Sequence, residues 1–280
     1  MARMIGLSAV DVDLLTGLNR FRLLTADQCV RLGMANPKHV RERLRRLLKA
    51  GLIHVTERGG LAGPHVYCLA PKGATTAAEW SEGRLALTPR KAPFGDTEHL
   101  NQRVAIVDVH MGLRAWAESV GAVVPWVRVE FDPNPSGLAP VTTVTHASLR
   151  YDADAVAHVT TADCENWLLA VEMETGGRTG SLSNFKARLD DRLTAFEQHV
   201  LEHALDWPKN SPTHRAARLL FVFKSPLMLE EAKKVARRKG GSVWRRVFFN
   251  SLPTVVDGFA SGWWQVGETT GSPFRPVGAS

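Results

Sequence analysis

The chain has 280 residues, 44% of them hydrophobic and 22% charged, which suits about two globular domains and excludes disordered and low-complexity classes. The net charge of +7 is unevenly spread, because residues 1–91 carry 15 basic and 7 acidic side chains, residues 92–206 carry 8 and 17, and residues 207–280 carry 12 and 4. The basic N- and C-terminal segments favour a polyanionic partner. The sequence has no long apolar run, no secretion signal and no closely spaced cysteines. These features predict a cytoplasmic protein with no membrane partner.

Three helices are expected near the N-terminus. Apolar side chains at helical spacing indicate a first helix over residues 10–18 and a second over residues 25–32. The third helix has the sharpest signals, because Asn36 is a good N-cap, Pro37 suits the first helical position and Gly51 can end the helix. One face of this third helix is apolar and the opposite face is basic.

A hairpin is expected directly after these helices. Residues 52–55 and 65–69 have strand character and are separated by a Gly-rich turn. Three helices and a two-stranded wing predict a winged helix-turn-helix DNA-binding domain over residues 1–81, whose third helix enters the major groove while the wing meets the backbone. The residues expected to bind DNA are Lys38, His39, Arg41, Arg45, Arg46 and Lys49 on the helix and Arg58 at the wing tip. The alternative is a protein-docking module whose basic helix face is simply solvated.

A linker rich in Pro, Gly and charge is expected at residues 82–97. The second domain, over residues 98–280, is predicted to be an α/β domain with a mixed central sheet, so the chain as a whole combines α+β and α/β features. Its expected elements are a helix over 98–119, an extended segment over 123–131, a Pro-rich loop over 132–148, strands over 153–160 and 167–174, a long helix over 183–205, a buried strand over 217–223, a basic helix over 230–239, and a Trp- and Phe-rich tail that completes the sheet.

Carboxylates near the ends of two expected strands suggest a metal site. Side chains alternate along a strand, so Glu172 and Glu174 share a face, and an adjacent strand can bring Asp154 opposite them. Mg²⁺ commonly binds one or two carboxylates together with water and substrate phosphate. A nearby cation such as Lys186 or Arg178 would complete a site that polarises a phosphate and activates water.

These features resemble known families over about residues 10–225. The order helix, three strands, helix, strand resembles the PD-(D/E)xK nuclease superfamily. More narrowly, a winged helix followed by His99-Leu100, Tyr-Asp-Ala-Asp-Ala-Val from Tyr151 and Val-Glu-Met-Glu-Thr-Gly from Val171 resembles the replication-relaxation family of plasmids and mobile elements.

The resemblance implies site residues. Asp154 and Glu172 match the family acids, whereas Glu174 stands where an active nuclease usually carries lysine. Lys186 on the following helix would then supply that charge from a displaced position. The resemblance thus implies catalytic Asp154, Glu172 and Lys186, with Mg²⁺ or Mn²⁺ held by Asp154, Glu172 and Glu174 if the site is active.

Two other interpretations of these residues stay open. Asp154 and Glu172 could be strand-end charges paired with arginines, namely Arg150, Arg178 or Arg188. Separately, His199 and His203 belong to an H-x-x-E-H pattern typical of zinc peptidases, with Glu268 as a third ligand. A peptidase fits poorly with a DNA-binding module and no secretion signal.

The expected function is that of a DNA-binding protein of plasmid replication or mobilisation type that selects a duplex site with its winged helix. With an active metal site it would be a Mg²⁺-dependent endonuclease that nicks or cleaves DNA. The alternative is a regulator or relaxosome accessory factor whose nuclease fold has lost catalysis. The partners expected are double-stranded DNA, a relaxase or replication protein and, if the chain self-associates, a second copy in a homodimer.

Overall fold

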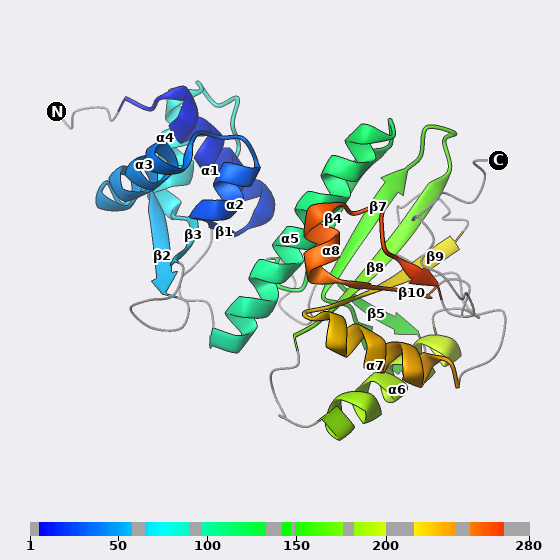
Figure 1. The fold of residues 1–280 in the computed structure, drawn as a ribbon. Helices are drawn as coiled ribbons and strands as arrows, with labels where there is room; N and C mark the ends of the chain where they lie inside the picture. Colours follow the sequence, from blue (N-terminus) through cyan, green and yellow to red (C-terminus); the bar gives the residue numbers. More distant parts are fainter. Residues whose placement is uncertain are drawn as a thin grey trace. The chain divides into compact units, whose positions relative to one another are not determined.

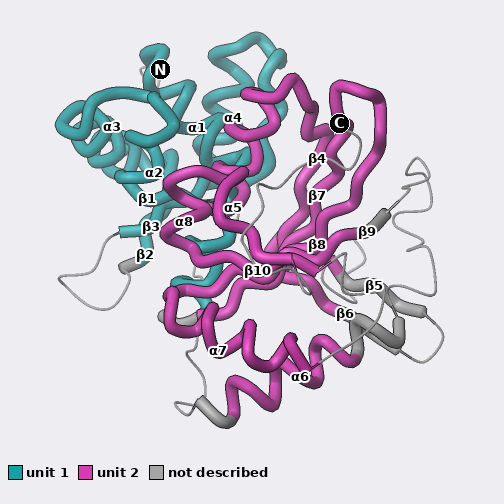
Figure 2. Tube along the Cα trace, turned by 45° about the vertical axis from the view of Figure 1, so that its right-hand side comes forward, with its two compact units in different colours: residues 1–107 teal, residues 108–280 magenta. Residues whose placement is uncertain are grey.

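The computed structural model describes residues 6–57, 65–89, 97–132, 142–146, 149–175, 182–199, 216–238 and 247–265 (Figure 1). The chain divides into two compact units, residues 1–107 and 108–280 (Figure 2). The division falls inside helix α5 (Thr97–Ser119). The linker at 82–97 and the domain ranges 1–81 and 98–280 stay predictions, and residues 90–96 of that linker lie outside the described part of the chain.

The first unit combines helices with a small antiparallel sheet of order β1-β3-β2. Its elements before α5 are α1 (Ala9–Phe21), β1 (Leu24–Thr25), α2 (Ala26–Arg31), α3 (Pro37–Lys49), β2 (Ile53–Glu57), β3 (His65–Leu69) and α4 (Pro71–Trp80). The side chains of Ser8, Thr25 and Asn36 cap the first three helices by accepting hydrogen bonds from backbone N–H groups of the first turn. The three predicted helices and the antiparallel strand pair are therefore confirmed.

The core of the first unit comes from one face of each long helix. Leu14 and Leu18 of α1 and Leu44 of α3 are fully or almost fully buried, at the three- and four-residue spacing of an amphipathic helix. The chain leaves α3 through Gly51, which has a φ of +72° that favours glycine. The start of α4 packs closely on the turn between α3 and β2, so that a Cβ at Gly73 would lie 2.0 Å from the Leu52 carbonyl oxygen.

The second unit is built on a six-stranded mixed sheet of order β11-β10-β9-β8-β7-β4. Strands β8, β9 and β10 run parallel to one another, while β4, β7 and β11 join by antiparallel pairing. The elements after α5 are β4 (Val123–Val129), β5 (Thr143–His146), β6 (Leu149–Asp152), β7 (Ala155–Thr160), β8 (Asn166–Glu174), α6 (Leu182–His199), β9 (Ala216–Phe223), α7 (Pro226–Ala236), β10 (Val247–Ser251), α8 (Leu252–Asp257) and β11 (Trp264–Gln265). The expected mixed α/β architecture is confirmed.

Helices α6 and α7 lie side by side and cover one face of this sheet (Figure 1). Phe185 of α6 and Leu229 of α7 share a buried cluster with Phe221, Phe223 and Phe249 of the sheet. Because side chains alternate along a strand, Val222, which lies between Phe221 and Phe223 in β9, points to the other face. That alternation also sets which charged side chains of β8 meet α6.

Some element boundaries differ from the sequence predictions. The region expected as a loop over 132–148 contains β5, which pairs with β6 in a separate two-stranded sheet. Helix α7 begins at Pro226 instead of Glu230, because Ser225 accepts a hydrogen bond from the Met228 N–H and Pro226 occupies the first turn. The predicted helix over 183–205 is present as α6 up to His199, and residues 200–215 lie outside the described ranges.

Candidate nucleic-acid interface and carboxylate cluster

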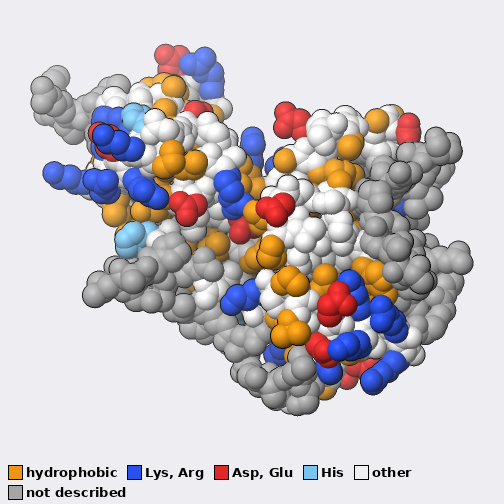
Figure 3. Space-filling model, in the orientation of Figure 1, with side chains coloured by type: hydrophobic (Ala, Val, Ile, Leu, Met, Phe, Trp, Pro, Cys, Tyr) orange, Lys and Arg blue, Asp and Glu red, His pale blue; other side chains and the backbone are white. Residues whose placement is uncertain are grey.

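Helix α3 presents a basic face to solvent. Val40, Leu44 and Leu47 are buried, and most cationic side chains of the helix point away from them. The side chains of Lys38, Arg41, Arg45, Arg46 and Lys49 are exposed and that of His39 is half-buried. Figure 3 shows Lys and Arg side chains gathered over this helix. Such an arrangement supplies the clustered positive charge that a phosphate backbone attracts.

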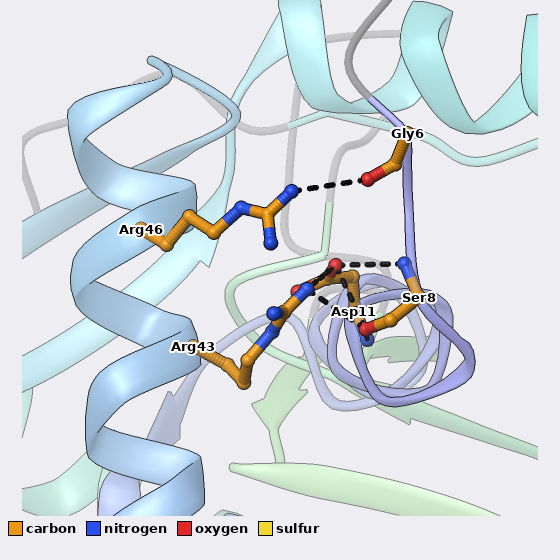
Figure 4. A network of polar contacts seen from close by, with 5 residues as sticks. All are labelled: Gly6, Ser8, Asp11, Arg43 and Arg46. Atoms are coloured by element: carbon orange, nitrogen blue, oxygen red, sulfur yellow. Dashed lines mark hydrogen bonds and ion pairs between the residues drawn. The ribbon is translucent and has the colours of Figure 1, made fainter.

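One arginine of α3 is turned inward instead (Figure 4). Arg43 pairs with Asp11 of α1, donating from Nε to Asp11 Oδ1 at 2.8 Å and from Nη2 to Ser8 Oγ at 2.8 Å. The Asp11 side chain is 1% exposed and that of Arg43 is 12% exposed. Burial alone would raise the pKa of Asp11, but hydrogen bonds from Arg43 and Ser8 outweigh it and lower the pKa below its usual value. The contacts of Arg43 with Asp11 and Ser8 therefore hold α3 against the N-terminal end of α1.

Arg46 is engaged less firmly. Its Nη2 donates to the Gly6 carbonyl oxygen at 3.1 Å (Figure 4), while the side chain stays at the surface. An exposed hydrogen bond of this kind contributes little to stability, so Arg46 can still face an anion. Arg58 lies outside the described residues.

In the second unit, the carboxylate of Asp154, directly before β7 (Ala155–Thr160), lies close to that of Glu172 in β8. Strands β7 and β8 pair with Ala155 opposite Val171, so Asp154 and Glu172 come one step beyond that pair, on the face that α6 and α7 cover. Both are buried. Asp154 Oδ2 accepts a hydrogen bond from the Met173 N–H at 2.6 Å. Burial, followed by the negative charge of Glu172, raises the pKa of Asp154 well above its usual range.

Two arginines of α6 face these acids. Arg192 Nη1 donates to Glu172 Oε2 at 2.9 Å and lies 3.9 Å from Glu174 Oε2. Arg188 Nη2 donates to Glu174 Oε1 at 3.3 Å. The two arginines are four residues apart and so lie on the same side of the helix. The sequence interpretation that paired Asp154 and Glu172 with Arg150, Arg178 or Arg188 named other partners than those seen here. Glu172 is paired with Arg192, which was not anticipated from the sequence, and Arg188 is paired with Glu174.

Lys186 has another partner. Its Nζ lies 2.6 Å from Glu231 Oε2 of α7, and Lys234 binds the same carboxylate at 2.6 Å. Hydrogen bonds from Lys186 and then Lys234 lower the pKa of Glu231 to about 2. The structure thus brings Asp154, Glu172 and Glu174 into one neighbourhood, whereas the contacts of Lys186 are made with α7.

For the other predicted site residues the structure describes no side chain. Arg178, His203 and Glu268 lie outside the described residues, and the side chain of His199 is not described. Within the described ranges, no three His, Cys, Asp or Glu side chains converge as a metal-binding group. No described helix is long and apolar enough to cross a membrane.

Comparison with known proteins gives one family. The sequence model of a family described as replication-relaxation matches residues 15–205, which is more than half of the chain. No curated protein and no solved structure matches the chain. The matched range begins within α1, includes α3 with its basic face, and runs past Asp154, Glu172 and both arginines of α6.

Proposed function

The chain belongs to the replication-relaxation family, and from this premise we propose that it binds duplex DNA in plasmid replication or mobilisation through a winged helix in its first unit. The observation that carries the proposal is the exposed basic face of α3 above a buried apolar face. Three helices followed by an antiparallel strand pair are the parts of a winged helix-turn-helix, in which the third helix enters the major groove. A protein-docking module would not need this density of cations on one helix face.

We further propose that the second unit acts without catalysis, as the accessory factor that the sequence analysis offered as an alternative. A nuclease of this kind needs a cation near the scissile phosphate. Lys186 binds Glu231 instead, and among the described side chains the guanidiniums of Arg188 and Arg192 bind Glu174 and Glu172. These arginines balance the charge of the acids, which favours a structural role for the cluster.

The described residues do not fit a resident divalent cation in this arrangement. Asp154 and Glu172 offer two carboxylates, a number that would suffice for Mg²⁺ together with water and substrate phosphate. However, Glu172 is already held by Arg192 at 2.9 Å, Glu174 is shared by two arginines, and Asp154 Oδ2 already accepts a hydrogen bond from the Met173 N–H. Binding of Mg²⁺ or Mn²⁺ would therefore require Glu172 and Glu174 to release their arginines.

Metal-dependent nicking is the second candidate function, and the opposed pair Asp154 and Glu172 is the observation that favours it. Supercoiled plasmid incubated with the protein and Mg²⁺ or Mn²⁺ separates the two candidates, with Asp154→Asn as the matched control. We expect plasmid binding but no conversion to the nicked form. Nicking by the wild type that the control lacks would establish the enzyme and overturn the accessory role.

DNA binding itself is tested by fluorescence anisotropy in a KCl titration. The double variant Arg41→Ala/Arg45→Ala should bind duplex DNA more weakly, and its salt slope should fall by about 0.9 for each phosphate that the variant no longer neutralises. The control is Lys72→Ala, which removes an exposed cation of α4. If affinity and slope are the same in wild type and double variant, α3 does not contact DNA.

A further inference from the structure

A pocket of about 420 Å³ lies between α2, α3 and the β2–β3 strand pair, entirely within the first unit. Arg41, Arg45 and Leu48 of α3 form one side. Thr25, Ala26 and Asp27 at the start of α2 lie opposite, and Val55, His65 and Tyr67 of the two strands complete the lining. This size is within the range of pockets that hold small organic ligands, roughly 300 to 1,000 Å³, and exceeds what one phosphate group needs.

The charged residues of the pocket favour an anionic group. Arg41 and Arg45 are one helical turn apart, so both guanidiniums lie on the same side of α3. Arg41 lies 3.7 Å from Asp27, but both side chains are mostly exposed, at 60% and 79%. An exposed ion pair of that length contributes little, so a phosphate can replace Asp27 as the partner of Arg41.

The remaining lining suits a flat body with a polar edge. Leu48 and Val55 are half-buried apolar side chains, and the exposed His65 imidazole can stack on a planar ring. A carboxylate such as Asp27 accepts hydrogen bonds from exocyclic amines of bases, that of cytosine among them. An anionic end, a planar body and an amine edge together describe a nucleotide.

We propose that this pocket takes one unpaired nucleotide of the bound DNA, with its phosphate at Arg41 and Arg45 and its base between Leu48, Val55 and His65. The inference rests on the proposed DNA binding and specifies which DNA the first unit prefers. A paired base is stacked inside the duplex and cannot enter such a pocket, so the nucleotide must already be unpaired or must leave the stack at a cost. The first unit then prefers a duplex with an unpaired nucleotide over a fully paired duplex.

The test compares two DNAs that differ by one nucleotide. Anisotropy at fixed KCl is measured with a paired duplex and with the same duplex carrying a single bulged cytidine. The wild type should bind the bulged DNA about tenfold more tightly, since stacking and edge contacts to one base are of this order. Val55→Phe and Ala26→Leu fill the pocket from different walls without changing charge, and each should abolish the preference while leaving affinity for the paired duplex within about twofold.

Lys38→Ala is the matched control, because Lys38 is an exposed cation of α3 that does not line the pocket. It should weaken binding to both DNAs and leave their ratio unchanged. Equal binding of paired and bulged DNA by the wild type overturns the inference and leaves the proposed function standing, whereas no duplex binding at all overturns both. Deoxycytidine monophosphate that competes equally against both DNAs identifies a free-nucleotide site and also overturns the inference.

Discussion

Removing the Arg192 guanidinium should destabilise the second unit by about 2 to 3 kcal/mol at pH 8. Glu172 is 1% exposed and its carboxylate is 2.9 Å from Arg192 Nη1, a separation at which the gross attraction is about 6 kcal/mol for an effective dielectric constant near 20. Breaking a buried pair by deleting one partner typically costs about 3 to 5 kcal/mol, because the other charge is left uncompensated. The Arg192 side chain is 42% exposed, and solvent screening brings the expected loss below that range.

Urea unfolding followed by tryptophan fluorescence measures this loss, since Trp167 and Trp264 are buried in the sheet. With a slope of about 2 kcal/mol per molar urea, Arg192→Ala should lower the midpoint by about 1 M.

Two control variants make the reasoning falsifiable. Arg188→Ala removes an arginine whose partner Glu174 is more exposed, so its midpoint should fall by less than half as much. The double variant Glu172→Gln/Arg192→Ala removes both charges and should recover much of the lost stability. An unchanged midpoint for Arg192→Ala at pH 8, with a folded protein, would refute the view that Arg192 balances the buried acids.

Three further predictions concern other parts of the chain. Asp11→Ala should cost about 3 kcal/mol of unfolding free energy at pH 7, because Arg43 is left without its buried partner. Folding lowers the pKa of Asp11, so this stabilisation is fully present above the unfolded pKa of about 3.9 and is lost as the pH falls through the folded pKa. The urea midpoints of variant and wild type should therefore converge in strong acid. Gly73→Ala should destabilise the first unit by about 1 to 3 kcal/mol in thermal unfolding, because its Cβ would meet the backbone oxygen of Leu52, and an unchanged melting temperature would contradict that packing. Limited proteolysis should cut first within residues 82–97, and first cleavage inside 153–174 would argue against a linker there.

Local signals in the sequence predicted the elements of the first unit well. Asn36, Pro37 and Gly51 act through contacts within a few residues of themselves, so α3 could be bounded without knowledge of the fold. Strands β5 and β6 were missed, because a two-stranded sheet depends on pairing between segments and the preceding residues are rich in proline.

The carboxylate site was predicted in part for a related reason. Because side chains alternate along β8, the sequence predicted that Glu172 points to one face of the sheet and can meet Asp154 from the neighbouring strand. The β7–β8 register brings the two residues opposite each other. Arg192, the cation that pairs with Glu172, was missed because its position depends on which side of α6 faces the sheet. Phe185 and Leu189 face the core, so Arg188 and Arg192 lie on one flank of the buried stripe and Lys186 on the other. The spacing of these apolar residues in the sequence could therefore have indicated which cations of α6 lie next to the acids.

The order of strands in the second unit also has a consequence for synthesis on the ribosome. Strand β9 lies between β8 and β10, yet β10 begins only at Val247, so this edge of β9 has no partner until β10 has been synthesised. Ala216–Phe223 is apolar apart from Arg218, and an exposed strand edge of this kind readily pairs with other chains. A chain truncated before Val247 should therefore aggregate rather than accumulate as a folded fragment.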